Sequence, residues 1–496
     1  MRLIQIAPTL QYGDAIGNYI LAIKRIAAEL GYETGIYVDD IHPRITDPDV
    51  YLMHQVPKLQ PEDILLYHLS IGSALNRTVL QYPCQRVMVY HNITPPDFFM
   101  KDAMDKVQAC QDGLDDVMFL ANKFDFCIAD SEFNRQDLIS MGYDGDKIAV
   151  VPVIVALDDY SQTPDAKRLA ELRSDDWVNF LFVGRVAPNK KHEDILRAFA
   201  YYKAHINHKA RLLLVGNHNA PNNYYDDLVA YVKALNIHDV QFLGHVSFAE
   251  ILACYAAADV FLCMSEHEGF CVPLLEAMTF DVPIIAYRST AVTETLGGSG
   301  VLLESKNPVY VARVMQQLAL DETWRTEVIE AQRKRLDDFR FEPLAERLRA
   351  TLQAFVSHAK AQTIAESEEY DALYDLVESR MESAGVRSGF SRTAFRAIAD
   401  QVPYTADLAR LLDMDCPNRD FLEVAYLTFF NRLPEPSVYD SWKQKADTME
   451  GFAFRRELLE VLRTSEECRD RGTKVYFDAC HPAPAKAASA QSSAQR

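Results

Sequence analysis

The order of hydrophobic and polar positions predicts alternating strands and helices along most of the chain. Short apolar runs, many of them rich in β-branched residues, stand between longer segments whose apolar residues recur every three or four positions, as in amphipathic helices. Such alternation is typical of parallel sheets covered by helices. The predicted strands are residues 1–7, 35–38, 64–69, 86–90, 126–129, 148–153, 179–183, 211–215, 240–243, 258–263 and 283–286.

The pattern changes at two places and so predicts boundaries. Residues 153–173 lose their periodicity and gain aspartates, a serine and a proline, which indicates a linker between two α/β lobes. Residues 341–355 carry an apolar stripe with a period of about one helical turn, which predicts an amphipathic helix.

Beyond residue 361 the pattern predicts helices only. These are residues 370–381, 391–402, 407–412, 420–430, 439–445 and 452–464. Aromatic residues at helical spacing in this region predict core packing first, and docking of an acceptor or a partner second. The last residues, 481–496, are rich in Ala, Ser, Gln and Pro, which is typical of disorder.

Composition narrows the class of protein. With 496 residues, of which 49% are hydrophobic and 25% charged, the chain is long enough for two or three globular domains. The formal net charge of −20 argues against a general nucleic-acid or anionic-membrane binder. Nine scattered cysteines predict reduced thiols in a cytoplasmic protein. We expect neither a signal peptide nor a membrane span.

One predicted loop combines a glycine with two carboxylates. The apolar run 258–263 ends at polar residues, and a helix with Pro273 near its first turn follows. Because loops after parallel strands lie at the sheet edge where ligands bind, Glu268 and Glu276, on either side of Gly269, should face one crevice. Taken singly, Glu276 also fits a first-turn glutamate favoured by the helix dipole, and Glu268 a solvated loop charge.

Glycines and cations mark two further strand-to-helix turns. Gly13, Asp14 and Gly17 follow the first strand, where glycines let backbone N–H groups approach a pyrophosphate at a helix N-terminus. A tight turn alone would need the same glycines. Arg185 and Lys190, after the first strand of the second lobe, suit a doubly charged phosphate; a solvated basic loop is the alternative.

The stretch Ser265–Met278 resembles the paired-glutamate signature of glycosyltransferase family 4. The resemblance implies an α/β chain of the GT-B fold: two Rossmann-like doubly wound lobes that face a central crevice, followed here by a small all-α C-terminal domain. That last domain resembles, more loosely, a helical domain of bacterial surface-polysaccharide proteins. The implied divisions are an N-terminal acceptor lobe (1–165), a nucleotide-sugar donor lobe (166–340), a helix crossing back to the first lobe (341–360), a helical accessory domain (361–480) and a disordered tail (481–496).

The resemblance also implies roles for single residues. Arg185 and Lys190 would bind the donor diphosphate, with Lys191 as the substitute if the register shifts by one, and Glu276 would bind the ribose. The implied catalytic residues are Arg185, Lys190, Glu268 and His91. Glu268 would bind hydroxyls of the donor sugar. His91 would contact the same sugar, and His68 is a second candidate for that role. The implied donor-binding residues are Gly13, Asp14, Gly17, Gly184, Val246 with Ser247, Gly269, Phe270, Cys271 and Glu276.

Two of these positions carry special expectations. Asp14 departs from the double glycine that is common in the family, so it would face the acceptor or the sugar instead. Glu294 would have a structural or supporting role. Cys271 lies in the signature loop without an evident general base, which favours a packing or backbone role over that of a nucleophile.

The implied function is transfer of a hexose, with retention of configuration, from a nucleotide-diphosphate sugar to a hydroxyl acceptor in bacterial surface-glycan assembly. The expected donor is GDP-mannose, and the expected acceptor is a glycan or lipid-linked glycan. The nucleotide sugar is a co-substrate, and neither a cofactor nor a metal is expected. Three Asp-x-Asp pairs, at 47–49, 144–146 and 413–415, are predicted to be turns.

Partners and alternatives stay open at this point. A cytoplasmic location is expected, with contact to the inner membrane or to a complex through the helical C-terminal domain as an option, and no nucleic-acid partner. One alternative is another GT-B enzyme, such as a nucleotide-sugar epimerase or phosphorylase, and another is a non-enzymatic scaffold of a polysaccharide-assembly complex. A hydrolase-like acid and nucleophile pair is the competing role for the two glutamates.

Overall fold

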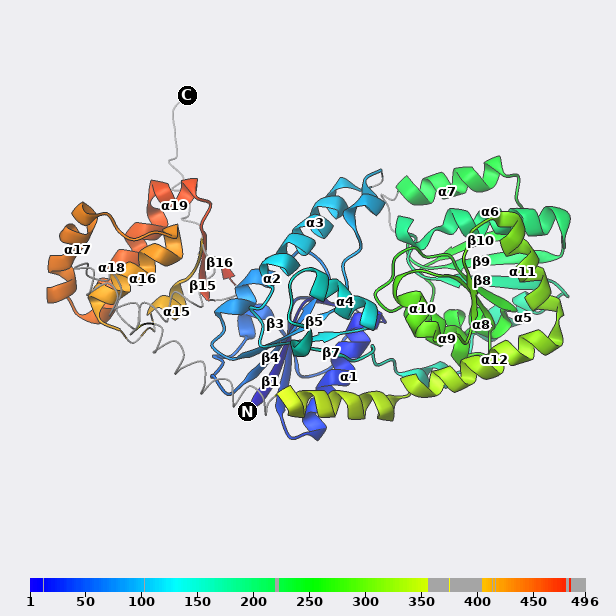
Figure 1. Ribbon diagram of the computed structural model, residues 1–496, viewed down its shortest axis with the longest axis horizontal. Helices are drawn as coiled ribbons and strands as arrows, with labels where there is room; N and C mark the ends of the chain where they lie inside the picture. Colours follow the sequence, from blue (N-terminus) through cyan, green and yellow to red (C-terminus); the bar gives the residue numbers. More distant parts are fainter. Residues whose placement is uncertain are drawn as a thin grey trace, which may run out of the picture. The chain divides into compact units, whose positions relative to one another are not determined.

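The computed structural model of the protein forms two compact units (Figure 1). The larger comprises residues 1–51, 62–73 and 86–355, and the smaller comprises 52–61, 74–85 and 356–496. The structure describes residues 1–11, 13–101, 103–218, 223–355, 374, 404–412, 414, 416–478 and 481–482. The predicted helices 370–381 and 391–402, apart from Tyr374, lie outside the described residues, as do Asp413, Asp415 and the predicted tail beyond residue 482.

The first lobe contains a seven-stranded sheet in the order β3-β2-β1-β4-β5-β6-β7. Its strands are β1 Arg2–Leu10, β2 Glu33–Ile41, β3 Val50–Leu52, β4 Ile64–Leu69, β5 Gln85–Tyr90, β6 Phe126–Ala129 and β7 Ile148–Val150. The helices of this lobe are α1 Ala15–Glu29, α3 Met104–Phe119 and α4 Glu132–Ser140, while α2 Leu75–Thr78 belongs to the smaller unit. Strand β1 pairs in parallel with both β2 and β4, so the strand order reverses at β1 and β4. In open parallel sheets, ligands bind at such a reversal.

The second lobe repeats this design with six strands in the order β10-β9-β8-β11-β12-β13. Its strands are β8 Val178–Val183, β9 Ala210–Val215, β10 Val240–Gly244, β11 Val260–Cys263, β12 Ile284–Tyr287 and β13 Val301–Leu303. Its helices are α5 Ala166–Leu172, α6 His192–His205, α7 Asn223–Ala234, α8 Phe248–Ala257, α9 Val272–Thr279, α10 Thr290–Leu296, α11 Pro308–Leu320 and α12 Glu322–Leu336. Here the order reverses at β8 and β11, the strands that precede Arg185 and the signature loop.

Burial explains why the strands could be predicted. Every residue of β4, β9 and β11 is buried, as expected for parallel strands covered by helices on both faces. In the second lobe, apolar side chains of β8 and β9 pack with those of α6 and α11 in one core. The GT-B architecture implied by the resemblance is therefore confirmed, with two doubly wound lobes. The short strands β3 and β13, three residues each, were not predicted.

The segment between the lobes is shorter than predicted. Helix α5 lies within the predicted linker 153–173. Asp165 caps its first turn by accepting a hydrogen bond from Arg168 N at 2.7 Å, which stabilises the helix there. The helix packs against α8. What remains between β7 and α5 includes a 3₁₀ turn, η5 Leu157–Ser161.

Residues 341–355 of the predicted crossover segment 341–360 form a helix, and the rest lies outside the described residues. Leu348 and Leu352 on its apolar stripe are fully buried. Its polar and aromatic residues reach the first lobe: Arg349 Nη2 lies 2.6 Å from Glu29 Oε2, and the rings of Phe355 and Phe126 lie 5.7 Å apart.

The smaller unit is helical, as predicted, but it also contains a small sheet. Its helices in the C-terminal region are α15 Leu408–Leu412, α16 Asn418–Phe430, α17 Pro436–Thr448, α18 Gly451–Thr464 and α19 Glu466–Asp470. Strands β14 Thr405–Asp407, β15 Lys474–Asp478 and β16 His481–Pro482 form a three-stranded sheet, so a purely helical domain was too simple a prediction. Phe421, Phe429 and Phe454 are fully buried, so these aromatic residues are core. Among the described helices, none is both long and apolar enough to cross a bilayer.

Candidate active site

Asp14 follows strand β1 of the first lobe, and Arg185 follows strand β8 of the second. The two side chains are close enough for their charges to interact. Asp14 is the N-cap of α1, and its Oδ1 accepts from Gly17 N at 2.6 Å. Burial raises the pKa of Asp14, while the Gly17 N–H and the nearby charges of Arg185 and His91 act to lower it. Arg185 is exposed, and its guanidinium has no hydrogen-bond or ion-pair partner among the residues that the structure describes. The side chain that sequence reasoning assigned to a diphosphate is thus available to bind an anion.

The glycine of this turn is sterically required. A Cβ on Gly17 would lie 2.5 Å from Gln11 O, so another residue would displace the backbone of the turn. The tight turn that the sequence pattern allowed as an alternative therefore explains Gly17, and pyrophosphate binding at this helix N-terminus stays a prediction.

A chain of side-chain hydrogen bonds crosses the first sheet. Gln5 in β1 contacts His68 in β4, with 3.0 Å between Oε1 and His68 Nε2, and His68 Nδ1 lies 2.9 Å from His91 Nε2. His91 Nδ1 in turn lies 2.8 Å from Asp130 Oδ2. These strands are consecutive in the sheet order, which is why residues far apart in sequence form one chain.

The direction of these hydrogen bonds follows from Gln5. Its Nε2 donates to Ile20 O at 3.0 Å, so its Oε1 must accept from His68 Nε2. Burial lowers the pKa of His68 well below its usual range, so its ring is neutral and its Nδ1 accepts from His91 Nε2–H. The remaining proton lies between His91 and Asp130, whose pKa is raised by burial and lowered by the imidazole.

This chain changes the expectation for His91. Its side chain is only 2% exposed, and both ring nitrogens are engaged by His68 and Asp130. Contact of His91 with a donor sugar stays a prediction, and it would require one of these hydrogen bonds to break. In the present arrangement both ring nitrogens of His91 serve the hydrogen-bonded chain within the first sheet.

Lys190 and Glu268 form a salt bridge in the second lobe. Lys190 Nζ lies 2.6 and 2.7 Å from the two carboxylate oxygens. Burial alone would lower the pKa of Lys190, but the Glu268 charge and hydrogen bonds raise it above its usual value. Lys191 pairs with Glu266 at 3.2 Å, so both lysines contact the signature stretch, and the choice of Lys190 over Lys191 as the diphosphate ligand stays a prediction.

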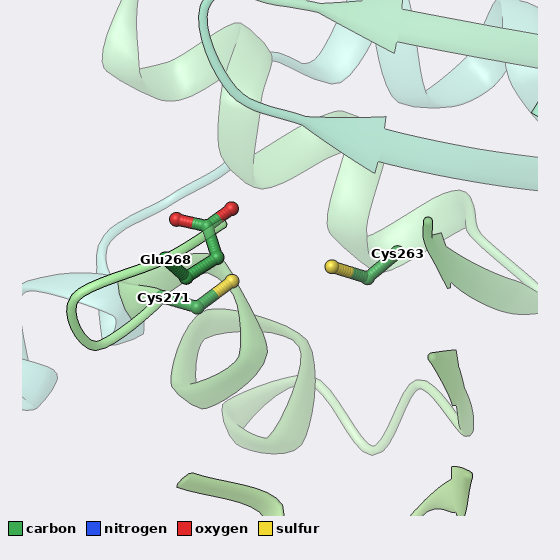
Figure 2. Close-up of side chains that lie close together, drawn as sticks. All are labelled: Cys263, Glu268 and Cys271. Atoms are coloured by element: carbon green, nitrogen blue, oxygen red, sulfur yellow. The ribbon is translucent and has the colours of Figure 1, made fainter. Parts of the chain in front are cut away.

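Two cysteines lie beside this salt bridge. The sulfur atoms of Cys263 and Cys271 and a carboxylate oxygen of Glu268 all lie within 4.8 Å of one another, and the three side chains are buried (Figure 2). Thiolates and a carboxylate are ligands of zinc-like cations. Here, however, the Lys190 ammonium already bonds both carboxylate oxygens, so its positive charge competes with any such cation. Cys271 also caps α9 in a left-handed conformation, with φ of 78°.

Glu276 has different surroundings from Glu268. Tyr160 Oη donates to its Oε1 and Tyr255 Oη to its Oε2, each at 2.5 Å. Burial raises the pKa of Glu276, and the two hydroxyls act to lower it. The two signature carboxylates therefore differ in partner: one pairs with a cation, and the other accepts from two neutral donors.

The signature loop touches the first lobe directly. A Cβ on Gly269 would lie 2.8 Å from Asn92 Cβ and 2.9 Å from His91 O, so this approach requires glycine. Ser131 Oγ donates to Gly269 O at 2.8 Å. Beside it, His267 Nε2 lies 2.6 Å from Asn92 Oδ1. These contacts bring the end of β5 and the start of α4 against the signature loop.

Glu294 joins the lobes at a second point. Its Oε1 accepts from Glu132 N at 2.8 Å and its Oε2 from Phe133 N at 3.2 Å. Both N–H groups belong to the first turn of α4, which has no intrahelical partner for them. The supporting role predicted for Glu294 thus takes the form of a carboxylate from the second lobe that caps a helix of the first.

The other predicted donor-binding residues have mixed surroundings. Phe270 is buried with its ring 5.7 Å from that of Phe339, and its carbonyl accepts a hydrogen bond from Thr295 Oγ1. Ser247 is the N-cap of α8 and forms a capping box with Glu250, while Val246 is half-buried. Gly184 follows β8 with φ of 154°. The assignments of Val246, Phe270 and Gly184 stay predictions.

Two of the predicted Asp-x-Asp pairs are turns or surface ion pairs. Asp144 Oδ1 accepts from Asp146 N at 3.0 Å in a 3₁₀ turn, and Lys24 pairs with Asp47 and Asp49. The third pair lies outside the described residues. The eight described cysteines are free.

The sequence analysis did not identify the residues whose hydrogen bonds position the predicted site residues. Gln5 and Asp130 carried a signal, because each is a polar residue within or at the end of an apolar strand, but linking them needs the strand order. Tyr255 reads as part of the apolar stripe of α8. Tyr160 follows two aspartates in the linker, and no pattern singled it out.

Comparison with known proteins finds a family match within the second lobe. Residues 166–335 match the family model "Glycosyl transferases group 1". This range covers β8 to β13 and includes Arg185, Lys190, Glu268 and Glu276.

Individual relatives are similar over part of the chain. The O-antigen chain mannosyltransferase B of Escherichia coli is 24% identical over 249 residues, which cover 48% of this chain and 62% of the relative. The D-inositol 3-phosphate glycosyltransferase of Corynebacterium diphtheriae is 28% identical over 171 residues, or 34% of this chain and 40% of the relative. The chain thus spans less than two thirds of the length of each of these curated relatives.

A solved structure shows the same fold. The crystal structure of Anabaena Alr3699/HepE in complex with UDP and glucose has a TM-score of 0.56 and 17% sequence identity to this chain. It covers 71% of this chain and all of its own. At this identity the likeness supports the GT-B fold and nothing finer.

Proposed function

We propose that this chain, in which residues 166–335 carry a group 1 glycosyl transferase domain, transfers a hexose from a nucleotide-diphosphate sugar to a hydroxyl acceptor. The observation that carries the proposal is the exposed Arg185, which has no hydrogen-bond or ion-pair partner among the described residues and lies near Asp14, the N-cap of α1, and near the Lys190–Glu268 pair. The Escherichia coli relative named as an O-antigen chain mannosyltransferase supports a bacterial surface polysaccharide as the product and mannose as the hexose. GDP-mannose as the donor is our proposal, and it rests on the resemblance to glycosyltransferase family 4.

The proposed chemistry places charge where the structure has cations and helix ends. Breaking the anomeric bond creates an oxocarbenium-like centre and a diphosphate with additional negative charge. Arg185 and the backbone N–H groups at the start of α1 would bind that diphosphate, and such electrostatic stabilisation is the larger catalytic effect. Lys190 would add its charge from behind the signature loop. Because these groups supply the positive charge, we propose that the transfer needs no bound metal. We also propose, from the family resemblance, that the transfer retains the anomeric configuration.

The two glutamates would orient the donor. Glu268 would bind hydroxyls of the sugar while it keeps its hydrogen bonds to Lys190, and Glu276 would bind the ribose. Fixing the reacting groups in this way lowers the entropy cost of the reaction. A hydrolase-like nucleophile is disfavoured, because the Lys190 ammonium bonds both oxygens of Glu268.

The acceptor and location complete the proposal. A glycan or lipid-linked glycan would bind on the side of the first lobe, and the smaller unit would supply any contact with a membrane surface or an assembly complex. The free buried cysteines suit the reducing cytoplasm.

Calorimetric titration of the full chain with GDP, UDP, ADP and their common sugar derivatives tests this function. We expect one nucleotide to bind tightly, and Arg185→Ala to weaken it at least about tenfold, because a charge-assisted phosphate contact is lost. Arg333→Ala, which removes an exposed arginine of α12, is the matched control. No binding of any nucleotide would exclude the active enzyme and favour the scaffold. Turnover of a nucleotide sugar without an acceptor would instead indicate an epimerase.

A further inference from the structure

The carboxylate of Glu276 is held by two tyrosines from two separate segments. Tyr160 belongs to η5, between the lobes, and Tyr255 to α8 of the second lobe. Each hydroxyl donates to a different oxygen of Glu276, and both distances are 2.5 Å. One donor therefore comes from the segment that joins the lobes, although the carboxylate itself belongs to the signature helix α9.

Aromatic packing fixes both rings. The Tyr160 ring meets those of Phe248 and Phe280 edge to face, with centroids 5.3 and 6.5 Å away. The Tyr255 ring stacks on Phe280 with centroids 5.5 Å apart. Burial and the adjacent Glu276 raise the pKa of both tyrosine hydroxyls, so they remain protonated donors. Neither ring can turn its hydroxyl away without losing these contacts.

The hydrogen bonds leave a defined capacity on Glu276. A carboxylate offers about four acceptor positions, two on each oxygen, and each tyrosine fills one of them. One position per oxygen remains. Two acceptors on neighbouring oxygens match two donors on neighbouring carbon atoms, which is the arrangement in a vicinal diol.

We propose that Tyr160 and Tyr255 are positioning residues that aim Glu276 so that each of its oxygens accepts one hydroxyl of the nucleotide ribose. This inference rests on the proposed function, which assigns the ribose to Glu276. It makes the segment between the lobes part of the nucleotide site, and it makes the site selective for ribonucleotides over deoxyribonucleotides.

The tyrosines also set the pH range in which Glu276 accepts hydrogen bonds. Burial raises the pKa of Glu276, and both hydroxyls oppose this because they stabilise the ionised form. The titratable groups that act on Glu276 are Tyr160 from η5 and Tyr255 from α8. Asp159 acts on Tyr160, and Cys271, at the start of α9, acts on Tyr255. Removing one hydroxyl should raise the pKa of Glu276 further, and ribose binding should then be lost at a higher pH on acidification.

The test uses Tyr160→Phe and Tyr255→Phe in the full chain. Each is titrated with GDP, UDP and ADP and with their 2′-deoxy and 3′-deoxy forms, at a series of pH values from neutral to acidic. For the unaltered chain we expect ribonucleotides to bind about tenfold more tightly than the deoxy forms, because a hydrogen bond to a charged group is lost. In each variant, the ratio of ribonucleotide to deoxynucleotide affinity should be smaller. Ribonucleotide binding should also be lost at a higher pH on acidification than in the unaltered chain. Tyr201→Phe, in α6, is the matched control.

The outcomes separate this inference from the proposed function. Equal affinity of the unaltered chain for ribo and deoxy forms, with binding still dependent on Arg185, would overturn the ribose assignment alone. An unchanged ratio and pH profile in both variants would show that the tyrosines only pack. If no nucleotide binds at all, the proposed function fails and this inference with it. Thermal unfolding of each variant checks that it folds. If only one of the two tyrosine variants folds, that variant alone tests the inference.

Discussion

At the scale of single residues, the Lys190–Glu268 salt bridge can be tested by its contribution to stability. The side chains are only 18% and 8% exposed. Removing one partner of such a pair leaves an uncompensated charge in a desolvated place, which typically costs about 3–5 kcal/mol. We therefore expect Glu268→Gln or Lys190→Met to lower the free energy of unfolding of the second lobe by about 3 kcal/mol.

Urea unfolding of the two single variants and the double variant measures this effect. The double variant should lose less than the sum of the single losses, because it leaves no unpaired charge. Additive losses would contradict the pairing. The exposed pair of Lys209 and Asp176, with 48% and 75% exposure, is the control, and Lys209→Met should leave the free energy of unfolding nearly unchanged.

The sequence predicted site residues that carry their own signal, but not those that act through position. Arg185 and Lys190 could be predicted because they follow a recognisable strand in a loop. Tyr160 could not, because nothing about a tyrosine in a linker indicates that its hydroxyl meets a carboxylate 116 residues later. His91 shows the same limit: its position at the end of a strand was predictable, but its engagement by His68 and Asp130 depends on the strand order.

At the scale of elements, the first turn of α4 depends on a carboxylate from the other lobe. Glu294 accepts from both Glu132 N and Phe133 N, where an anion also interacts favourably with the helix dipole. Loss of such a cap typically costs about 1 kcal/mol. We expect Glu294→Ala to accelerate amide hydrogen exchange in the first turn of α4, measured by mass spectrometry on peptides that span residues 126–140.

A matched substitution makes that result specific. Glu322→Ala removes a first-turn glutamate from α12 and should leave exchange in α4 unchanged. Unaltered protection of α4 in Glu294→Ala would show that water replaces the carboxylate at no cost. Faster exchange throughout both lobes would point to general destabilisation rather than to loss of a cap.

Elements could be predicted where local pattern and burial agree. The strand β6 was predicted with its observed bounds, Phe126–Ala129, because apolar residues there meet polar ones on both sides. Strands β14 and β15 were missed, since they pair only with each other and β16, across about seventy residues of chain, and each is short. Helix α5 was missed because its polar sequence resembles a linker, while its cap, Asp165, is a residue type equally common in turns.

At the scale of the whole molecule, the described contacts between the two lobes at the crevice are largely polar, and the His267 ring also meets those of Phe98 and Phe133. Ser131 with Gly269, Asn92 with His267, and Glu294 with the start of α4 are polar contacts that a small motion can break. Domains joined by polar contacts are expected to move relative to each other. The crossover helix at 341–355 is different, because its apolar stripe is buried and it ends on the first lobe.

That helix gives the prediction that concerns the molecule as a whole. Phe355 is 2% exposed and packs against Phe126 of β6. Truncating a buried phenylalanine typically costs about 3–5 kcal/mol, so Phe355→Ala should destabilise the first lobe although residue 355 follows the second lobe in sequence. Hydrogen exchange should rise in β6 and α1 and stay unchanged in β8 to β12. Glu346→Ala, on the exposed face of the same helix, should change neither lobe. If Phe355→Ala instead increased exchange mainly in the second lobe, the helix would belong energetically to the lobe it leaves, and the first lobe would fold without it.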